Sequence, residues 1–217
     1  MKDSLLVLSG GLDSTTMLYE YKERIALCVS FHYGSNHNDR ELHFAALHCS
    51  RLNIPHRIIR LPFFKELFNS SLLQGDKAIP EGDYNEQNML STVVPFRNGI
   101  MLSIAAGIAE NEKLQYIMLA NHSGDHTIYP DCRPGFVAAM DQAVKEGTFN
   151  NVRLLTPYTD ISKADIALRG KKLGIDYSET WSCYRGGEHQ CGKCGTCRER
   201  IEALQLAGID DKTIYQR

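Results

Sequence analysis

The 217-residue sequence contains no run of about 18 apolar residues, the length that a membrane-spanning helix requires. Its first residues do not resemble a secretion signal, so we expect a cytoplasmic protein without a membrane partner. It also lacks a long basic tract and carries a net charge of −2, so stable nucleic-acid binding is not expected. A hydrophobic content of 43% is enough for a core without disulfides.

Two familiar nucleotide-binding patterns are also missing. The sequence has neither G-x-x-x-x-G-K-[ST] nor G-x-G-x-x-G, which excludes the usual triphosphate loop and the dinucleotide fingerprint. Residues 5–16 read LLVLSGGLDSTT instead, where an apolar strand, Leu5 to Leu8, runs into two glycines and a helix that Asp13 opens. A glycine turn at a helix N-terminus predicts a binding site for an anion such as phosphate.

The hexapeptide SGGLDS matches the pyrophosphate-binding loop of the ATP pyrophosphatases, which transfer AMP to an oxygen of their substrate. The alternative is an ordinary glycine-rich turn capped by serine and aspartate. Because all six positions match directly after the first strand, the functional interpretation is favoured over the structural one.

Apolar and polar segments alternate through the rest of the chain. Strands are expected at residues 25–31, 56–61, 116–120 and 152–155, and helices at 39–52, 99–109, 134–146 and 163–174. This alternation predicts an α/β fold with a doubly wound, mostly parallel sheet. Residues 62–94 are expected to form a flap beside the site or a disordered insertion. His37, in the loop after the second strand, is expected to face solvent, with contact to a nucleotide as the alternative. His48 is also expected to face solvent.

Two basic residues stand at the starts of predicted helices. Arg97 begins one helix and Lys163 begins another, although a cation at a helix N-terminus opposes the helix dipole. Their positions are explained if each faces a phosphate or a substrate carboxylate.

Four of the seven cysteines lie within fifteen residues, at Cys183, Cys191, Cys194 and Cys197. Clustered thiolates predict a closed tetrahedral zinc site with a structural role, and an iron–sulfur cluster is the alternative. We therefore expect two units: an ATP-binding α/β domain at 1–176, and a small zinc lobe with the C-terminal helix at 177–217.

The motifs SGGLDSTT, VPFRN, YPDCRP and the cysteine cluster occur in this order, and together they resemble the 7-cyano-7-deazaguanine synthase family of queuosine biosynthesis. The resemblance covers essentially the whole chain. It implies an adenine-nucleotide alpha-hydrolase-like (Rossmann-like) fold, ATP, Mg²⁺, one structural Zn²⁺ and a homodimer. The implied substrates are 7-carboxy-7-deazaguanine and ammonium, joined through an adenylated carboxylate and then an adenylated amide. Phe96 departs from the glycine expected in VPGRN.

The resemblance also assigns residues by position. It places ATP at Leu8, Ser9, Gly10, Gly11, Leu12, Asp13, Ser14, Thr15, Thr16, Met17 and Leu18. Catalytic roles are expected for Asp13, Ser14, Arg97 and Lys163. Substrate contacts are expected for Arg97, Asn98, Asp125, Asp131 and Arg133, with a helix N-cap as the alternative role of Asp131.

Three other functions are compatible with parts of the sequence. A tRNA-thiolating enzyme on the same scaffold needs a reactive cysteine, for which Cys132 is the candidate, and a basic face that the charge balance disfavours. A ligase that modifies a protein carboxyl terminus is weakly excluded. A zinc-stabilised nucleotide-binding module without catalysis is disfavoured by the intact SGGLDS loop.

Overall fold

The computed structural model describes residues 2–75, 79–125 and 128–216. Five parallel strands form one sheet in the order β3-β2-β1-β4-β5. Their bounds are Ser4–Val7 (β1), Ile25–His32 (β2), His56–Arg60 (β3), Tyr116–Met118 (β4) and Arg153–Leu155 (β5). The chain runs outward from β1 to β3 and then crosses to β4 on the other side of β1. The doubly wound parallel fold is confirmed, and its switch point lies between β1 and β4.

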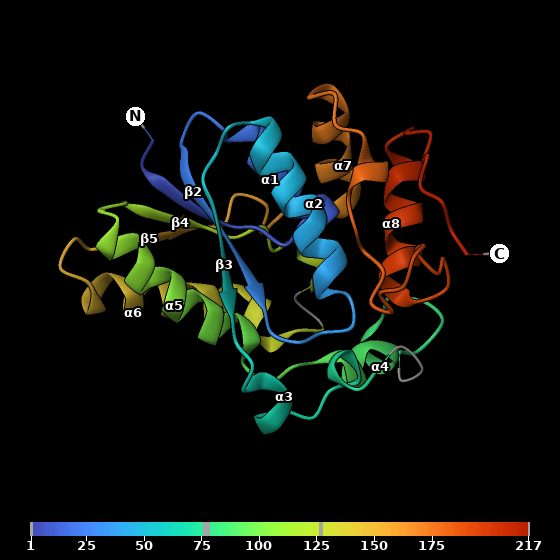
Figure 1. Ribbon diagram of the computed structural model, residues 1–217, viewed down its shortest axis with the longest axis horizontal. Coiled ribbons are helices and arrows are strands. Elements are labelled where there is room, and N and C mark those ends of the chain that lie inside the picture. The colour runs from blue at the N-terminus through green and yellow to red at the C-terminus, as the bar shows by residue number, and fades with distance from the viewer. Residues whose placement is uncertain (1, 76–78, 126–127, 217) are drawn as a thin grey trace.

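Helices cover both faces of this sheet (Figure 1). One face packs α1 (Leu12–Glu20), α2 (Asn38–Arg51) and α7 (Lys163–Lys172) against Leu6, Cys28 and Met118. The other face packs α5 (Arg97–Asn111) and α6 (Pro134–Gly147) against Leu5, Val29 and Ile117. Leu5 and Leu6 point to opposite faces because side chains alternate along a strand. This burial on both faces explains why β1 reads as a continuous apolar run.

Residues 62–94 contain two short helices, α3 (Phe64–Leu67) and α4 (Glu86–Met89), and 3-10 turns at Ser71–Leu73 and Leu90–Thr92; positions 76–78 lie outside the described residues. The segment docks on the cysteine-rich region that precedes α8 (Gly195–Leu206). Gly82 N–H donates to the Lys193 carbonyl at 3.0 Å, and Arg198 pairs with Asp83 at 2.7 Å. The described part of this segment is therefore tied to the C-terminal region through the backbone and an ion pair.

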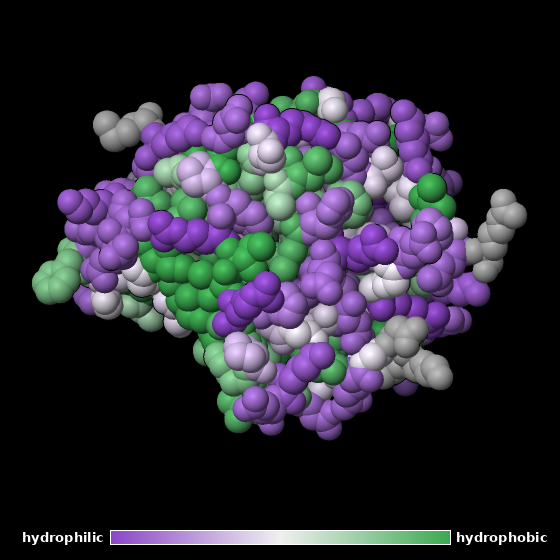
Figure 2. All heavy atoms as spheres, in the orientation of Figure 1, coloured by the Kyte–Doolittle hydropathy of each residue, from purple (hydrophilic) through white to green (hydrophobic). Residues whose placement is uncertain are grey.

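The most apolar helix, α5, is only half covered. Its alanines and leucine pack on the sheet, while Ile100, Ile104 and Ile108 are partly buried. Figure 2 shows an apolar area over the edge strand β3 and α5. In the described ranges no single helix has the length and apolarity to cross a membrane. Residues 86–92 and 97–111 meet that test only as a pair, across a bend of 55°.

The expectation for His48 is wrong. His48 is fully buried: its Nδ1 bonds to the Tyr19 hydroxyl at 3.0 Å, and its Nε2 bonds to the Glu179 carbonyl at 2.8 Å. The reason is that Glu179, more than a hundred residues away in sequence, covers this side of α2. Helical periodicity alone could not reveal that cover.

Phe96 adopts a left-handed backbone conformation, with φ 51° and ψ 29°, directly before α5. This is the position where glycine was expected, and a left-handed conformation favours glycine because it has no Cβ. The Phe96 ring is tolerated because it packs edge-on against Phe136 at 5.6 Å and lies over Gly99. A Cβ at Gly99 would lie 2.3 Å from that ring, so the two residues are matched.

We expect Phe96→Gly to be more stable than Phe96→Ala by about 1 kcal/mol, because both remove the ring but only glycine relieves the left-handed strain. Urea unfolding midpoints of the two variants measure the difference. Equal midpoints would show that alanine escapes the left-handed conformation.

Candidate active site

The SGGLDS loop joins β1 to α1 and requires glycine at one position. Gly10 has φ +88°, and a Cβ there would lie 2.2 Å from the Glu41 carbonyl oxygen and 2.9 Å from the Ala45 nitrogen. Beyond it, Ser9 Oγ lies 2.9 Å from Ser14 Oγ and accepts the Gly11 N–H at 3.1 Å. The first N–H groups of α1 have no acceptor within the helix, so they are available to an anion.

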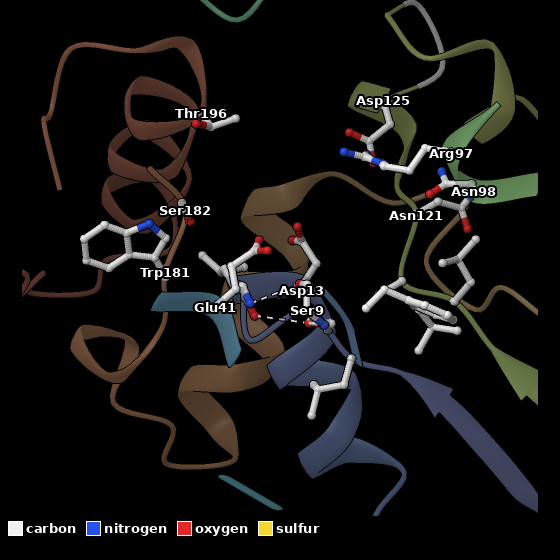
Figure 3. A pocket seen from close by; sticks show the side chains of 18 of the residues that line it. Ser9, Asp13, Glu41, Arg97, Asn98, Asn121, Asp125, Trp181, Ser182 and Thr196 are labelled. Carbon is white, nitrogen blue, oxygen red and sulfur yellow. Dashed lines mark hydrogen bonds between the residues drawn. The ribbon is translucent and has the colours of Figure 1, made fainter. Parts of the chain in front are cut away.

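A cavity of about 230 Å³ opens above this loop, at the carboxyl ends of β1, β2 and β4. Figure 3 shows its side chains coming from several elements, with Arg97, Asn98, Asn121 and Asp125 on one side and Trp181, Ser182 and Thr196 on the other. The residues predicted from sequence that line it are Leu8, Ser9, Gly11, Leu12, Asp13, Ser14, Arg97, Asn98, Asp125 and Lys163.

The other predicted site residues lie elsewhere. Thr15, Thr16, Met17 and Leu18 are fully buried within α1, where they support the loop, and Gly10 packs beneath it. The lining does not include Asp131 or Arg133. Asp131 Oδ2 instead accepts the Asn98 N–H at 2.7 Å, so it satisfies a backbone donor in the first turn of α5.

Lys163 is held between two carboxylates at the edge of the cavity. Its Nζ lies 3.5 Å from Asp13 and 2.5 Å from Glu199 Oε2. Burial by itself would lower the pKa of Lys163, but the negative charges of Asp13, Glu199 and Asp125 outweigh it and raise the pKa. Lys163 is therefore a fixed positive charge beside the loop.

Arg97 lies among aromatic rings. Its Nη1 donates to the Tyr33 hydroxyl at 3.2 Å, and its guanidinium carbon lies 5.6 Å from the Tyr33 ring centroid and 5.9 Å from that of Tyr129. In the described parts of the chain no carboxylate lies within ion-pair distance of Arg97. A cavity-lining guanidinium in this setting can take an anionic ligand.

Several lining residues were not predicted as site residues from the sequence: Tyr33, His37, Glu41, Tyr84, Asn121, Tyr129, Trp181, Ser182, Tyr184 and Thr196. The expectation that His37 faces solvent is wrong, because it is 2% exposed and stacks on Tyr184 at 5.1 Å. Burial lowers the pKa of His37 to about 3, so its imidazole is neutral. The spacing of His37 and Glu41, four residues apart at the start of a helix, was the one available signal.

Residue 84 connects the segment before α5 to the cavity. The Tyr84 hydroxyl donates to Asp125 Oδ1 at 2.9 Å, and its ring lies 5.8 Å from Lys163 Nζ. The segment expected to form a flap therefore contributes one wall of the cavity through Tyr84.

The four clustered cysteines are brought together as their spacing predicted. Their Sγ atoms all lie within 4.8 Å of one another, and all four residues are buried. The backbone N–H groups of Lys193 and Cys194 donate to Cys191 Sγ at 3.4 and 3.3 Å, which favours a thiolate there. Four enclosed sulfur ligands fit one tetrahedral metal ion with no open coordination position.

The cysteine cluster and the cavity share one helix. Cys194 stands at the N-cap of α8 and Cys197 in its first turn. Between them Thr196 lines the cavity, and two residues after Cys197 the Glu199 carboxylate bonds Lys163. An ion held by the cysteines would therefore fix the part of α8 that touches the site.

Comparisons with known proteins agree with this arrangement. Residues 3–208 match the family model described as queuosine biosynthesis protein QueC. A curated relative from Porphyromonas gingivalis, named 7-cyano-7-deazaguanine synthase, is 60% identical over 215 residues, covering 99% of this chain and 98% of the relative. Relatives with the same name from Desulfotalea psychrophila and Methanoregula boonei are 53% and 45% identical, and the matches cover 98–99% of each chain.

Among solved structures, the NMN synthetase from Francisella tularensis superimposes with a TM-score of 0.53 at 12% identity, covering 96% of this chain and 78% of that one. This likeness supports the fold alone. The match to the family model and the full-length relatives identify the chain as a member of the QueC family of queuosine biosynthesis proteins.

Proposed function

We propose that this protein is a 7-cyano-7-deazaguanine synthase, which converts 7-carboxy-7-deazaguanine and ammonium to the nitrile at the expense of ATP. The observation that carries the proposal is a single cavity that joins the SGGLDS loop to Arg97. A carboxylate is a poor electrophile, and transfer of AMP to it creates a good leaving group. The reaction then needs a binding site for phosphates next to one for the substrate carboxylate, and the SGGLDS loop and Arg97 are suited to these two roles.

In this proposal the loop binds ATP through its phosphates. Ser9, Gly10, Gly11 and Ser14 cradle the pyrophosphate, and Lys163 neutralises charge that develops during AMP transfer. Asp13 fits a magnesium ligand because its Oδ1 is buried without a hydrogen-bond partner among the described residues. Magnesium, when bound, neutralises phosphate charge, while Leu12 and the buried residues 15–18 keep the start of α1 in place.

The substrate is proposed to lie on the side of Arg97, Asn98 and Asp125. Arg97 would hold the 7-carboxylate, which supplies the anion that the guanidinium lacks. Tyr129 offers an aromatic surface for the deazaguanine ring. Asp131 and Arg133 do not line the cavity and would act from behind its lining residues. Asp131 would do so through its bond to the Asn98 backbone.

The four-cysteine cluster is proposed to hold one structural Zn²⁺. Four thiolates in a closed site suit zinc, and the ion would supply folding energy to residues 177–217, the proposed zinc lobe. The proposal also retains a homodimer and a cytoplasmic location. The apolar area over β3 and α5 is a surface that a second copy could cover.

The thiolation alternative finds little support at Cys132. Burial raises the pKa of this thiol, and the neighbouring carboxylates of Asp125 and Asp131 raise it further. A protonated thiol is a poor nucleophile. The side chain is also occupied, since Asn98 Nδ2 donates to its sulfur at 3.1 Å.

The test is mass spectrometry of the products formed from purified protein, ATP, magnesium, ammonium and 7-carboxy-7-deazaguanine. We expect the nitrile together with AMP, and the amide as a transient species. Bound ATP with no change in the deazaguanine would contradict the proposal and would favour a different acceptor for AMP.

A further inference from the structure

Glu41 is a cavity residue with no role in the mechanism proposed above. It lies in the first turn of α2, and its backbone carbonyl packs directly on Gly10 of the loop. Its side chain is 18% exposed and lines the same cavity as Asp13 and Arg97 (Figure 3). The carboxylate is thus held at the site by the packing that makes Gly10 necessary.

This carboxylate lacks the partners that other acids of the cavity have. Asp13 faces Lys163, and Asp125 accepts the Tyr84 hydroxyl. For Glu41 the described residues offer only His37 Nε2, at 3.7 Å, and that imidazole is neutral because it is buried. A carboxylate that is mostly withdrawn from water and has no cation or hydrogen-bond donor beside it favours a ligand that supplies one.

The charge of Arg97 reaches Glu41. Burial raises the pKa of Glu41 to about 8, and the positive charge of Arg97 opposes this rise without cancelling it. Because Arg97 is the proposed binding residue for the substrate carboxylate, Glu41 and the reacting carbon would share one cavity. A substrate anion on Arg97 would also neutralise this guanidinium, whose positive charge opposes the rise in the pKa of Glu41.

The proposed reaction must bind a cation, ammonium, near the substrate carboxyl group and must remove a proton from it. Nitrogen enters as ammonium, which has four N–H donors and no lone pair, so it cannot attack carbon before it loses a proton. A carboxylate of ordinary acidity is a weak base for ammonium, whereas burial makes Glu41 a stronger one.

We propose that Glu41, in its ionised form, binds the incoming ammonium ion and accepts its proton, which frees ammonia to attack the adenylated carboxyl carbon. This inference rests on the proposed function. The nitrogen lone pair forms the C–N bond, and the C–O bond to AMP breaks with its electron pair leaving on AMP. The adduct releases a second N–H proton to water, which yields the neutral amide. Formation of the nitrile from the amide takes no further ammonium. That half removes two N–H protons from the substrate itself, and the proposal assigns these protons to water and not to Glu41.

Separate assays of the two halves of the reaction distinguish the delivery of ammonia by Glu41 from other roles of this residue. One assay starts from the carboxylic acid with ammonium, and the other starts from 7-amido-7-deazaguanine without ammonium, both with ATP and magnesium. Glu41→Gln keeps the shape of the side chain and removes the base. Asp39→Asn is the matched control, an exposed carboxylate in the same turn of α2.

For Glu41→Gln we expect acid-to-amide conversion to fall about 100-fold and KM for ammonium to rise about tenfold. Conversion of the amide to the nitrile should stay within about twofold of wild type. Asp39→Asn should match wild type in both assays. A melting curve checks the fold of each variant. Glu41→Asp keeps a carboxylate but places it farther back on a shorter side chain, so it should show a smaller defect, confined to the conversion of the acid to the amide.

Other outcomes would overturn the proposal. Equal loss in both halves would place Glu41 in a step that both halves share, such as ATP binding, metal binding or a common proton transfer, and normal rates in both would remove Glu41 from the reaction. A wild-type protein that converts neither substrate would instead refute the proposed function itself, which distinguishes that failure from a failure of the Glu41 role alone.

Discussion

Asp13→Asn is expected to lower AMP formation on the order of 1,000-fold while the protein stays folded. The substitution preserves size but removes the charge that would organise magnesium and face Lys163. Folding should survive because Lys163 keeps its bond to Glu199 at 2.5 Å. The lost interaction matters when charge develops on the phosphates, so the effect should fall on kcat.

Steady-state assays of AMP release and a circular-dichroism melting curve measure the two parts of this prediction. Asp210→Asn, at an exposed carboxylate away from the cavity, is the control and should keep full activity. A rate near that of wild type would exclude Asp13 from the mechanism. A large fall in melting temperature would assign the loss of activity to unfolding.

Cys194→Ser should lose bound zinc and stability together, with the free energy of unfolding reduced by several kcal/mol. Apparent binding energies of structural zinc are on the order of 10 kcal/mol, and in such sites binding energy is folding energy. Because the same helix places Thr196 and Glu199 at the cavity, activity should fall with the metal.

Elemental analysis and thermal melting measure this result. Cys49→Ala is the control, since Cys49 is also buried but belongs to the core under α2; it should lose some packing energy and keep one zinc per chain. Wild-type protein treated with a chelator should melt near the temperature of Cys194→Ser. A zinc-free variant with an unchanged melting curve would contradict a structural metal.

Local features of the fold could be predicted because the residues responsible are neighbours in sequence. The helix predicted to begin at Lys163 is one case. In the structure a capping box precedes it: Ser162 Oγ accepts the Asp165 N–H at 3.2 Å, and the Asp165 carboxylate accepts the Ser162 N–H at 3.1 Å. The strands lie close to the predicted segments for the same reason, since apolar runs between turns are local signals. The division at residue 176 remains a prediction.

The cavity residues also divide into those that sequence reasoning could select and those that it could not. Asp13, Arg97 and Lys163 could be selected from sequence because each stands at a helix start with an unusual charge or motif. Glu41 and His37 could not, because their importance arises from the packing of α2 on Gly10 and of His37 on Tyr184. Asp131 was ambiguous, and only the position of the Asn98 N–H shows its contact with α5.

By itself the sequence determined three things about this protein: an alternating α/β chain, a glycine turn after the first strand that is suited to an anion, and a cluster of four cysteines that is suited to a metal ion. Each depends on residues close together along the chain, where backbone geometry leaves few arrangements. The tertiary structure alone decided the crossover that places β4 beside β1, the contact of Lys163 with Glu199, and the position of Glu41 in the cavity beside the buried His37. Those features join distant segments, and burial and charge balance become defined only when the segments pack.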